Sequence, residues 1–151
     1  MDVTSRRIAT ALKTAIQREE RTAAAYGDQA RKTKDPGAGK VLEALVKQEL
    51  SHARKLKLIL NHGVDSSVLG KRSRLLADSL HVLNDDIRMV EKSGDAARVL
   101  ARAIKAEENS MRLYSSLEKI YRGLEVAELF GKLAQEEESH RARLEKALAR
   151  L

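Results

Sequence analysis

Glutamate and histidine recur at matched positions in the two halves of this 151-residue chain. The segments LVKQELSH and LAQEEESH each place a glutamate three residues before a histidine, and another glutamate lies thirty residues upstream of each pair. On a helix, residues three apart lie on the same face. Carboxylate and imidazole groups together are suitable ligands for iron, manganese or zinc. The six candidate metal ligands are Glu19, Glu49, His52, Glu107, Glu137 and His140.

An internal repeat relates the two sets of candidate ligands. Residues 15–60 align with residues 103–148 without a gap at an offset of 88, and 11 of 46 positions are identical. Copies of a helical hairpin that drift apart keep apolar core types, because stacking must still bury a shared core. They have no packing reason to keep glutamate and histidine. The retained polar residues therefore predict a shared chemical role.

The composition predicts an all-α fold. The chain has one proline, three tyrosines, one phenylalanine and no tryptophan. It is rich in alanine, leucine, lysine, arginine and glutamate, which are strong helix formers. Apolar residues at steps of three and four predict helices over about 5–32, 36–61, 71–92, 95–121 and beyond Gly123 to the C-terminus. Asp35 and Pro36 are typical of a helix start.

The candidate ligands fill gaps in the apolar stripes of these helices, so they are predicted to point into the core. Glu19 precedes Asp35 by 16 residues and Glu49 follows it by 14, which places both at one level of an antiparallel hairpin to within about 3 Å. The second half repeats these counts around Gly123. Buried carboxylates must take up protons or be neutralised by a cation, because desolvation costs several kcal/mol per ion and like charges repel. Ligands in this arrangement form a carboxylate-bridged dinuclear site in four-helix bundles.

These motifs resemble those of the rubrerythrin and ferritin-like di-iron family. The pattern Ala-Ile-x-x-Glu with tyrosine seven residues later, followed by Leu-x-x-x-Glu-x-x-His, occurs twice, as AIQREERTAAAY with LVKQELSH and as AIKAEENSMRLY with LAQEEESH. The resemblance implies one iron at Glu19 and His52, a second iron at Glu107 and His140, and bridging by Glu49 and Glu137. It also implies that Tyr26 and Tyr114 lie beside the ligands.

The chain departs from the family pattern at several positions. Rubrerythrins usually carry an extra metal-binding glutamate one turn after the third-helix ligand, but Ser110 stands there, and Thr22 stands at the matching place in the first half. The more symmetric ligand set resembles that of bacterioferritin. However, Leu50 occupies the place of the haem methionine, so no haem is predicted. Without cysteine there is no rubredoxin-like module, and electrons must come from an external donor.

The resemblance implies one ferritin-like domain over residues 1–151, with a first hairpin at 5–62, a helical crossover at 63–94 and a second hairpin at 95–151. The implied function is the reduction of hydrogen peroxide or dioxygen with oxidation of Fe(II), as a peroxidase or a ferroxidase. Two alternatives stay open: a di-iron hydroxylase of an organic or RNA substrate, and a non-catalytic helical interaction protein that the metal only stabilises. Manganese and zinc are alternatives to iron.

The composition also narrows the partners and the compartment. The absence of cysteine excludes disulfides, Cys-ligated zinc and iron–sulfur clusters. No run approaches the ~18 consecutive apolar residues of a membrane span, so we expect a cytoplasmic protein with no membrane partner. The formal net charge is +7, but the sequence offers no aromatic platform for stacking bases, so nucleic acid is not an expected partner. Short loops and the crossover favour a homodimer.

The remaining glutamates near the motifs and the other two histidines are expected outside the site. Solvated or rim charges are expected at Glu20, Glu108, Glu136 and Glu138, and surface or helix-end positions at His62 and His81.

Overall fold

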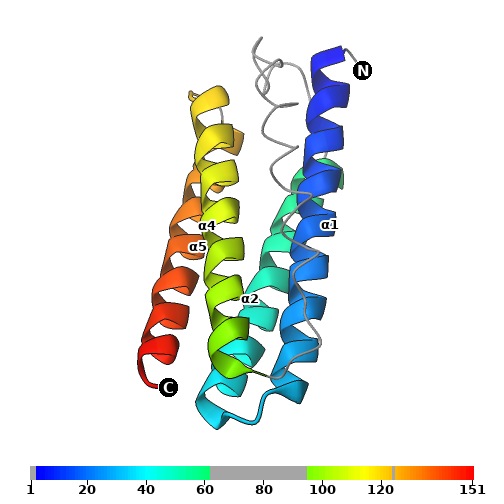
Figure 1. Ribbon diagram of the computed structural model, residues 1–151. Coiled ribbons are helices and arrows are strands. Elements are labelled where there is room, and N and C mark those ends of the chain that lie inside the picture. Colours follow the sequence, from blue (N-terminus) through cyan, green and yellow to red (C-terminus); the bar gives the residue numbers. More distant parts are fainter. Residues whose placement is uncertain (1–2, 62–94, 124) are drawn as a thin grey trace.

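The computed structural model describes residues 3–61, 95–123 and 125–151, which form four α-helices (Figure 1). The helices are α1 (Val3–Lys32), α2 (Pro36–Asn61), α4 (Ala96–Ile120) and α5 (Glu125–Ala149). No strand occurs within these ranges. The predicted all-α four-helix bundle is confirmed, and each of its four helices lies within a few residues of its expected range. The expected helix at 71–92, the crossover at 63–94, His62 and His81 lie outside the described residues.

The helices pair as two antiparallel hairpins. Helix α1 packs on α2, α4 packs on α5, and contacts between α2 and α5 join the hairpins. Figure 1 shows that α2 and α4 run in one direction along the bundle, whereas α1 and α5 run in the other. Each hairpin therefore contributes one helix of each direction. None of the described helices is both long enough and apolar enough to cross a membrane.

Local signals in the sequence fix the ends of the hairpins. The carboxylate of Asp35 accepts a hydrogen bond from the Ala38 backbone N–H at 2.8 Å, as expected of a residue that caps the start of α2. Asp95 caps α4 in the same way, with an oxygen 3.1 Å from the Ala97 nitrogen. Gly123 adopts a φ of +92° between α4 and α5, a conformation that glycine reaches without a steric penalty. These ends set the level at which side chains of paired helices meet.

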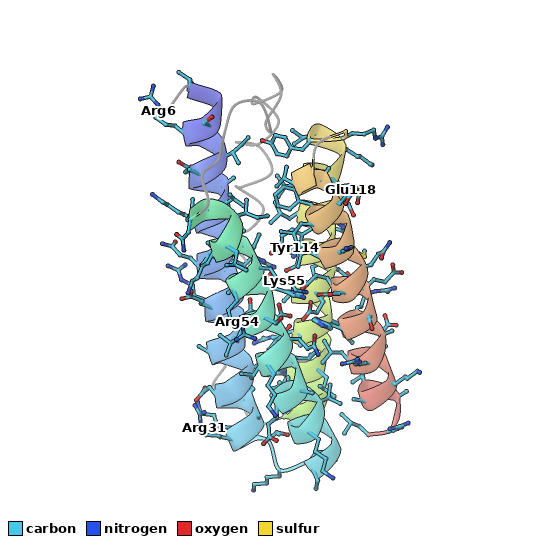
Figure 2. The ribbon with its side chains drawn as sticks, turned by 180° about the vertical axis from the view of Figure 1, so that it is seen from behind. Arg6, Arg31, Arg54, Lys55, Tyr114 and Glu118 are labelled. Atoms are coloured by element: carbon cyan, nitrogen blue, oxygen red, sulfur yellow. The ribbon has the colours of Figure 1, made fainter. Side chains whose placement is uncertain are left out.

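The bundle core has two apolar regions separated by a polar layer. One region centres on Leu12, Leu56, Leu117 and Phe130, and the other centres on Leu42, Leu45, Leu100 and Leu144. Along every helix, the candidate ligands lie between these regions, and none is more than 2% exposed. Figure 2 shows Arg6 and Arg31 reaching away from the bundle, whereas Tyr114 lies between the hairpins. The fold thus buries a polar layer that the apolar regions shield from both ends.

Candidate metal centre

All six predicted ligands meet in the polar layer, where they form two overlapping groups. Each group offers four side-chain ligand atoms that lie within 4.8 Å of one another. Glu49 and Glu137 belong to both groups, as the predicted bridging role requires. The first group is Glu19, Glu49, His52 and Glu137, and the second is Glu49, Glu107, Glu137 and His140. Such overlapping carboxylate and imidazole groups are compatible with metal binding.

Both histidines turn their Nδ1 atoms toward the carboxylates. Nδ1 of His52 lies 2.7 Å from Glu137, 3.3 Å from Glu49 and 3.7 Å from Glu19. Nδ1 of His140 lies 3.2 Å from Glu49, 3.7 Å from Glu107 and 3.9 Å from Glu137. The two imidazole rings stack with their centroids 5.4 Å apart and their planes inclined by 11°. Each ring therefore presents the same nitrogen to one carboxylate from its own helix and two from other helices.

The two tyrosines link the hairpins across the site. The hydroxyl of Tyr26 on α1 donates a hydrogen bond to Glu107 on α4 at 2.9 Å. The hydroxyl of Tyr114 on α4 donates a short hydrogen bond to Glu19 on α1. These contacts are equivalent under the sequence repeat, because an offset of 88 relates both the tyrosines and the glutamates. Each tyrosine therefore orients a carboxylate of the opposite hairpin, beside the predicted ligands as the resemblance implies.

The electrostatics of the buried layer divide the four glutamates into two pairs. Burial and the charge of neighbouring carboxylates raise the pKa of Glu49 and of Glu137 well above the ordinary value of 4.5. Burial would also raise the pKa of Glu107, but its interactions within the cluster, foremost with Glu137 and His140, lower it to about 2. The pKa of Glu19 is also lowered, because its interactions with Glu49, His52 and Tyr114 outweigh burial. Without a cation, the two shared carboxyl groups are therefore the ones that retain protons.

Glu136 lies closer to the site than the sequence indicates. Its side chain is 38% exposed, which agrees with the expected rim position, but its Oε2 lies 2.5 Å from Nε2 of His52. Its other oxygen lies 3.4 Å from Nζ of Lys55. Helical periodicity rotates Glu136 by about 100° from Glu137 and so assigns it to the outside of α5. Periodicity alone cannot show that the ring of a neighbouring helix reaches that far.

Arg18 is a buried cation that the apolar pattern of α1 does not predict. It is 3% exposed, and it donates hydrogen bonds to the hydroxyl of Ser110 and to the backbone carbonyl of Ala106, each at 3.0 Å. Under the repeat, Ala106 is the counterpart of Arg18 itself. One half thus supplies a long cationic side chain where the other supplies a small residue and an acceptor. An apolar stripe does not reveal a buried arginine. The difference between Arg18 and Ala106 at matched positions of the repeat is the one sequence feature that points to it.

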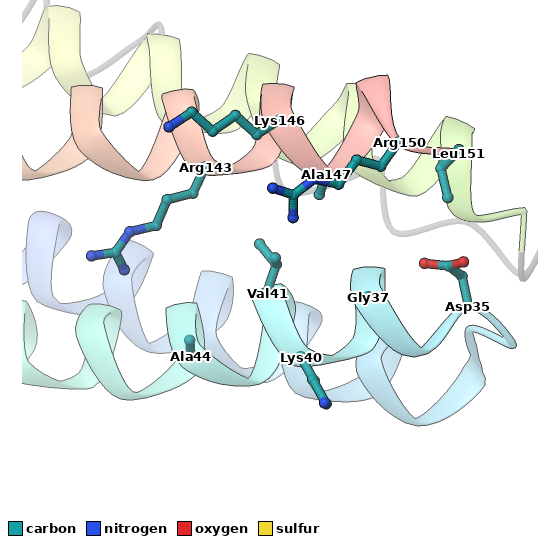
Figure 3. Close-up of a pocket in the computed structure, with 10 residues that line it drawn as sticks. All are labelled: Asp35, Gly37, Lys40, Val41, Ala44, Arg143, Lys146, Ala147, Arg150 and Leu151. Atoms are coloured by element: carbon teal, nitrogen blue, oxygen red, sulfur yellow. The ribbon is translucent and has the colours of Figure 1, made fainter.

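A separate groove of about 450 Å³ lies between the start of α2 and the end of α5 (Figure 3). It has an apolar floor that includes Val41 and Ala147. Its cationic residues are Lys40, Arg143, Lys146 and Arg150, and its acidic residue is Asp35. Figure 3 shows Lys40 and Lys146 pointing in different directions, so these cations do not converge on one position. The groove therefore does not define a second ligand site.

Taken together, the helices and the buried layer define the class of the protein: an all-α, ferritin-like four-helix bundle with a carboxylate–histidine cluster in its core. The family model Rubrerythrin matches residues 98–151, which cover nearly all of α4 and all of α5 with Glu107, Glu137 and His140. No curated protein and no solved structure matches the chain. The chain is consistent with the rubrerythrin and ferritin-like family, and its first hairpin repeats the ligand pattern of the matched segment.

Proposed function

We propose that this protein is a rubrerythrin-like non-haem di-iron oxidoreductase that reduces hydrogen peroxide or dioxygen as Fe(II) is oxidised to Fe(III). One observation carries the proposal: two four-residue groups of buried carboxylate and imidazole ligands share Glu49 and Glu137. A single-ion site would not need two overlapping groups with one histidine each. The repeat doubles the set of candidate ligands, which supports the proposal of two ions over one.

The donor atoms fit a pair of cations. Among the described residues, several buried atoms of the cluster have no hydrogen-bond partner, including one oxygen each of Glu49 and Glu107 and both oxygens of Glu137. An unsatisfied buried polar atom costs about 1–3 kcal/mol, and more when it is charged. A bound cation would satisfy these atoms and neutralise the carboxylates at the same time. Oxygen ligands with one imidazole for each position suit iron or manganese, whereas structural zinc more often closes a single four-coordinate site.

The chain's own residues then have distinct roles. Glu19 and His52 would hold one ion, and Glu107 and His140 the other. Glu49 and Glu137 face both positions, so they can hold the two ions together. A ferrous pair would supply two electrons, which together with two protons from solvent convert one hydrogen peroxide to two water molecules. Tyr26 and Tyr114 keep the carboxylates of Glu107 and Glu19 in place through their hydrogen bonds.

Rapid-mixing absorbance spectroscopy tests this proposal. Anaerobic protein loaded with two equivalents of Fe(II) is mixed with hydrogen peroxide or with dioxygen, and ferric absorbance is followed over milliseconds to seconds. We expect rapid oxidation in the wild type and in Glu138→Gln, which removes an exposed charge beside the site. We expect slow, solution-like oxidation in Glu137→Gln, which lacks a shared ligand. Wild-type oxidation no faster than that of free Fe(II) would contradict the proposal and favour the non-catalytic alternative.

Further measurements distinguish between the kinds of activity that such a site could have. Repeated turnover with an external electron donor indicates a peroxidase, whereas accumulation of iron beyond two ions per chain indicates a ferroxidase with a storage role. Product analysis with organic or RNA substrates would reveal a hydroxylase.

Metal analysis of protein purified from its native host decides between iron, manganese and zinc. Light scattering tests the proposed homodimer, which predicts twice the 16.8 kDa mass of the chain.

A further inference from the structure

The outer nitrogen of His52 faces a carboxylate. Oε2 of Glu136 lies 2.5 Å from Nε2 of His52, on the side of the ring opposite the cluster. A carboxylate accepts hydrogen bonds and cannot donate them, so Nε2 of His52 carries the shared hydrogen. Deprotonation of the ring for metal binding then leaves the lone pair on Nδ1, which is the nitrogen that faces Glu19, Glu49 and Glu137. Glu136 thus fixes both the tautomer and the direction of His52.

Among the residues that the structure describes, no carboxylate lies against Nε2 of His140 in the same way. The repeat matches Glu136 with Gln48 and His52 with His140. An amide carries no charge, so it cannot form the charge-assisted hydrogen bond that a carboxylate forms with an imidazole N–H. Inside the cluster the two metal positions are alike. Both histidines present Nδ1 to three carboxylates, and Glu19 and Glu107 each accept a hydrogen bond from a tyrosine hydroxyl. The outer partner of the histidine is therefore a point where the symmetry of the two positions is broken.

We infer that Glu136 is a positioning residue that makes the two metal positions unequal, so that the position of Glu19 and His52 fills before that of Glu107 and His140. This inference rests on the metal site of the proposed function. A carboxylate behind a metal-bound histidine orients the ring and makes its ligand nitrogen more basic, and loss of such a partner typically costs 10–100-fold in metal affinity. Lys55 lies 3.4 Å from the other oxygen of Glu136 and holds that carboxylate at the ring. Glu136 is partly exposed, so its replacement by glutamine leaves the apolar core intact.

Calorimetric titration of the metal-free protein with Mn(II), which air does not readily oxidise, tests the inference. The wild type is expected to bind two ions in two steps whose affinities differ by about 10–100-fold. Glu136→Gln should weaken the tighter step and bring the two affinities together, and Gln48→Glu should tighten the weaker step. Glu138→Gln removes an exposed charge from the same helix, and it should leave both steps unchanged. The tighter step should survive in His140→Ala and be lost in His52→Ala.

A spectroscopic measurement separates positioning from a general effect on the fold. In protein loaded with diamagnetic Zn(II), the Nε2 proton of His52 should give a downfield NMR signal that is protected from exchange with water. Glu136→Gln should shift that signal upfield and increase its exchange rate, while the remaining amide spectrum stays as in the wild type. Two wild-type ions bound with equal affinity, or two unequal steps that persist unchanged in Glu136→Gln, would overturn the inference alone. A wild type that binds no Mn(II) and no Zn(II) would overturn the proposed metal site, and the inference with it.

Discussion

At the scale of single residues, the shared carboxyl groups of Glu49 and Glu137 meet opposing demands. Burial and the neighbouring carboxylates raise their pKa values, so the metal-free fold favours their uncharged forms. A metal ligand must be deprotonated, so cation binding requires the charged forms. The residues that best serve two ions are therefore the ones that most oppose folding without them.

Glu137→Gln should consequently stabilise the metal-free protein while it weakens metal binding. In the metal-free fold at pH 8 the carboxyl group must either bind a proton or carry a penalised charge, whereas the amide is neutral at every pH and avoids both costs. Because each pKa unit corresponds to about 1.4 kcal/mol, we expect the free energy of unfolding in urea with a chelator at pH 8 to rise by about 1–3 kcal/mol. The gain in melting temperature on addition of Mn(II) should shrink at the same time. A destabilised metal-free variant would show that this carboxyl group contributes hydrogen bonds instead of a charge penalty.

The tyrosine hydroxyls give a second prediction, which has a control within the same chain. Tyr26→Phe and Tyr114→Phe each remove a hydrogen bond to a carboxylate whose pKa is lowered, and each should cost about 1.5–3 kcal/mol in urea unfolding. The Tyr121 hydroxyl is buried but makes no hydrogen bond to any residue that the structure describes. Tyr121→Phe should therefore cause no loss of stability and should stabilise the protein by up to about 1–3 kcal/mol, because it removes a buried polar group that has no partner there. Equal losses in all three variants would argue against specific support of the glutamates.

The sequence could predict which six carboxylate and imidazole side chains lie together in the core because two independent signals agreed on them. Helical periodicity assigned them to core faces, and the repeat retained their types. Glu136 and Arg18 could not be found in this way. Their contacts depend on which neighbouring helix their side chains reach, and a pattern along one helix does not contain that information. Contacts between hairpins, such as those of the two tyrosines, require the assembled bundle.

At the scale of the helices, the ends were the most predictable feature, because their signals are local. Asp35 and Asp95 accept hydrogen bonds from free N–H groups at the helix starts, and Gly123 provides the positive φ of the second turn. The hairpin levels follow from these ends and from the rise per residue. The direct contact between α2 and α5 could not be predicted. Buried polar positions occur on both helices of each hairpin, so the sequence pattern does not indicate which helices of the two hairpins face each other.

Two glycines at different places in the helices should respond oppositely to alanine. Gly27 lies inside α1, and an added Cβ would meet Arg31 at 3.7 Å and Val46 at 3.8 Å, which are ordinary contacts. Gly27→Ala should stabilise the protein by about 0.5–1 kcal/mol, because alanine loses less backbone entropy in a helix. Gly123→Ala should destabilise it by about 1 kcal/mol or more, because its φ is +92°. Thermal unfolding followed by circular dichroism measures both, and a stabilising Gly123→Ala would contradict the described turn.

At the scale of the whole molecule, the two hairpins enclose the buried layer together. Each hairpin supplies one histidine, one glutamate that belongs to both groups and one that belongs to a single group, Glu19 or Glu107. The tyrosine of each hairpin donates a hydrogen bond to that last glutamate of the other hairpin. Neither hairpin alone assembles a four-residue group, because each group includes a shared glutamate from the opposite hairpin. The proposed metal binding would therefore be coupled to the stability of the entire bundle, and a property of the whole fold should report on the buried layer.

The pH dependence of stability should accordingly differ between the metal-free and metal-loaded protein. The folded-state pKa values of Glu49 and Glu137 lie well above the ordinary 4.5. The pKa of His52 is also raised above 6.5, because its interactions with Glu19 and Glu136 outweigh burial. Between pH 4.5 and these raised values the folded state binds more protons than the unfolded chain, so stability must fall as pH rises. The lowered pKa of Glu107 acts in the opposite direction, but only below pH 4.5.

Melting temperatures measured from pH 5 to pH 8.5, with chelator or with saturating Mn(II), test this sign. The metal-free wild type should lose stability toward high pH. The loaded protein should gain stability through the range near pH 6.5 in which unfolded histidine loses its proton, because a bound cation keeps its carboxylate and imidazole ligands deprotonated in the fold. The double variant E49Q/E137Q serves as the control for the net charge of the rest of the molecule. Its metal-free slope should be flatter than that of the wild type, and Mn(II) should not reverse it. Parallel slopes in the two metal-free proteins would mean that the shared carboxyl groups do not hold the protons assigned to them, and the buried layer would then owe its pH dependence to its histidines.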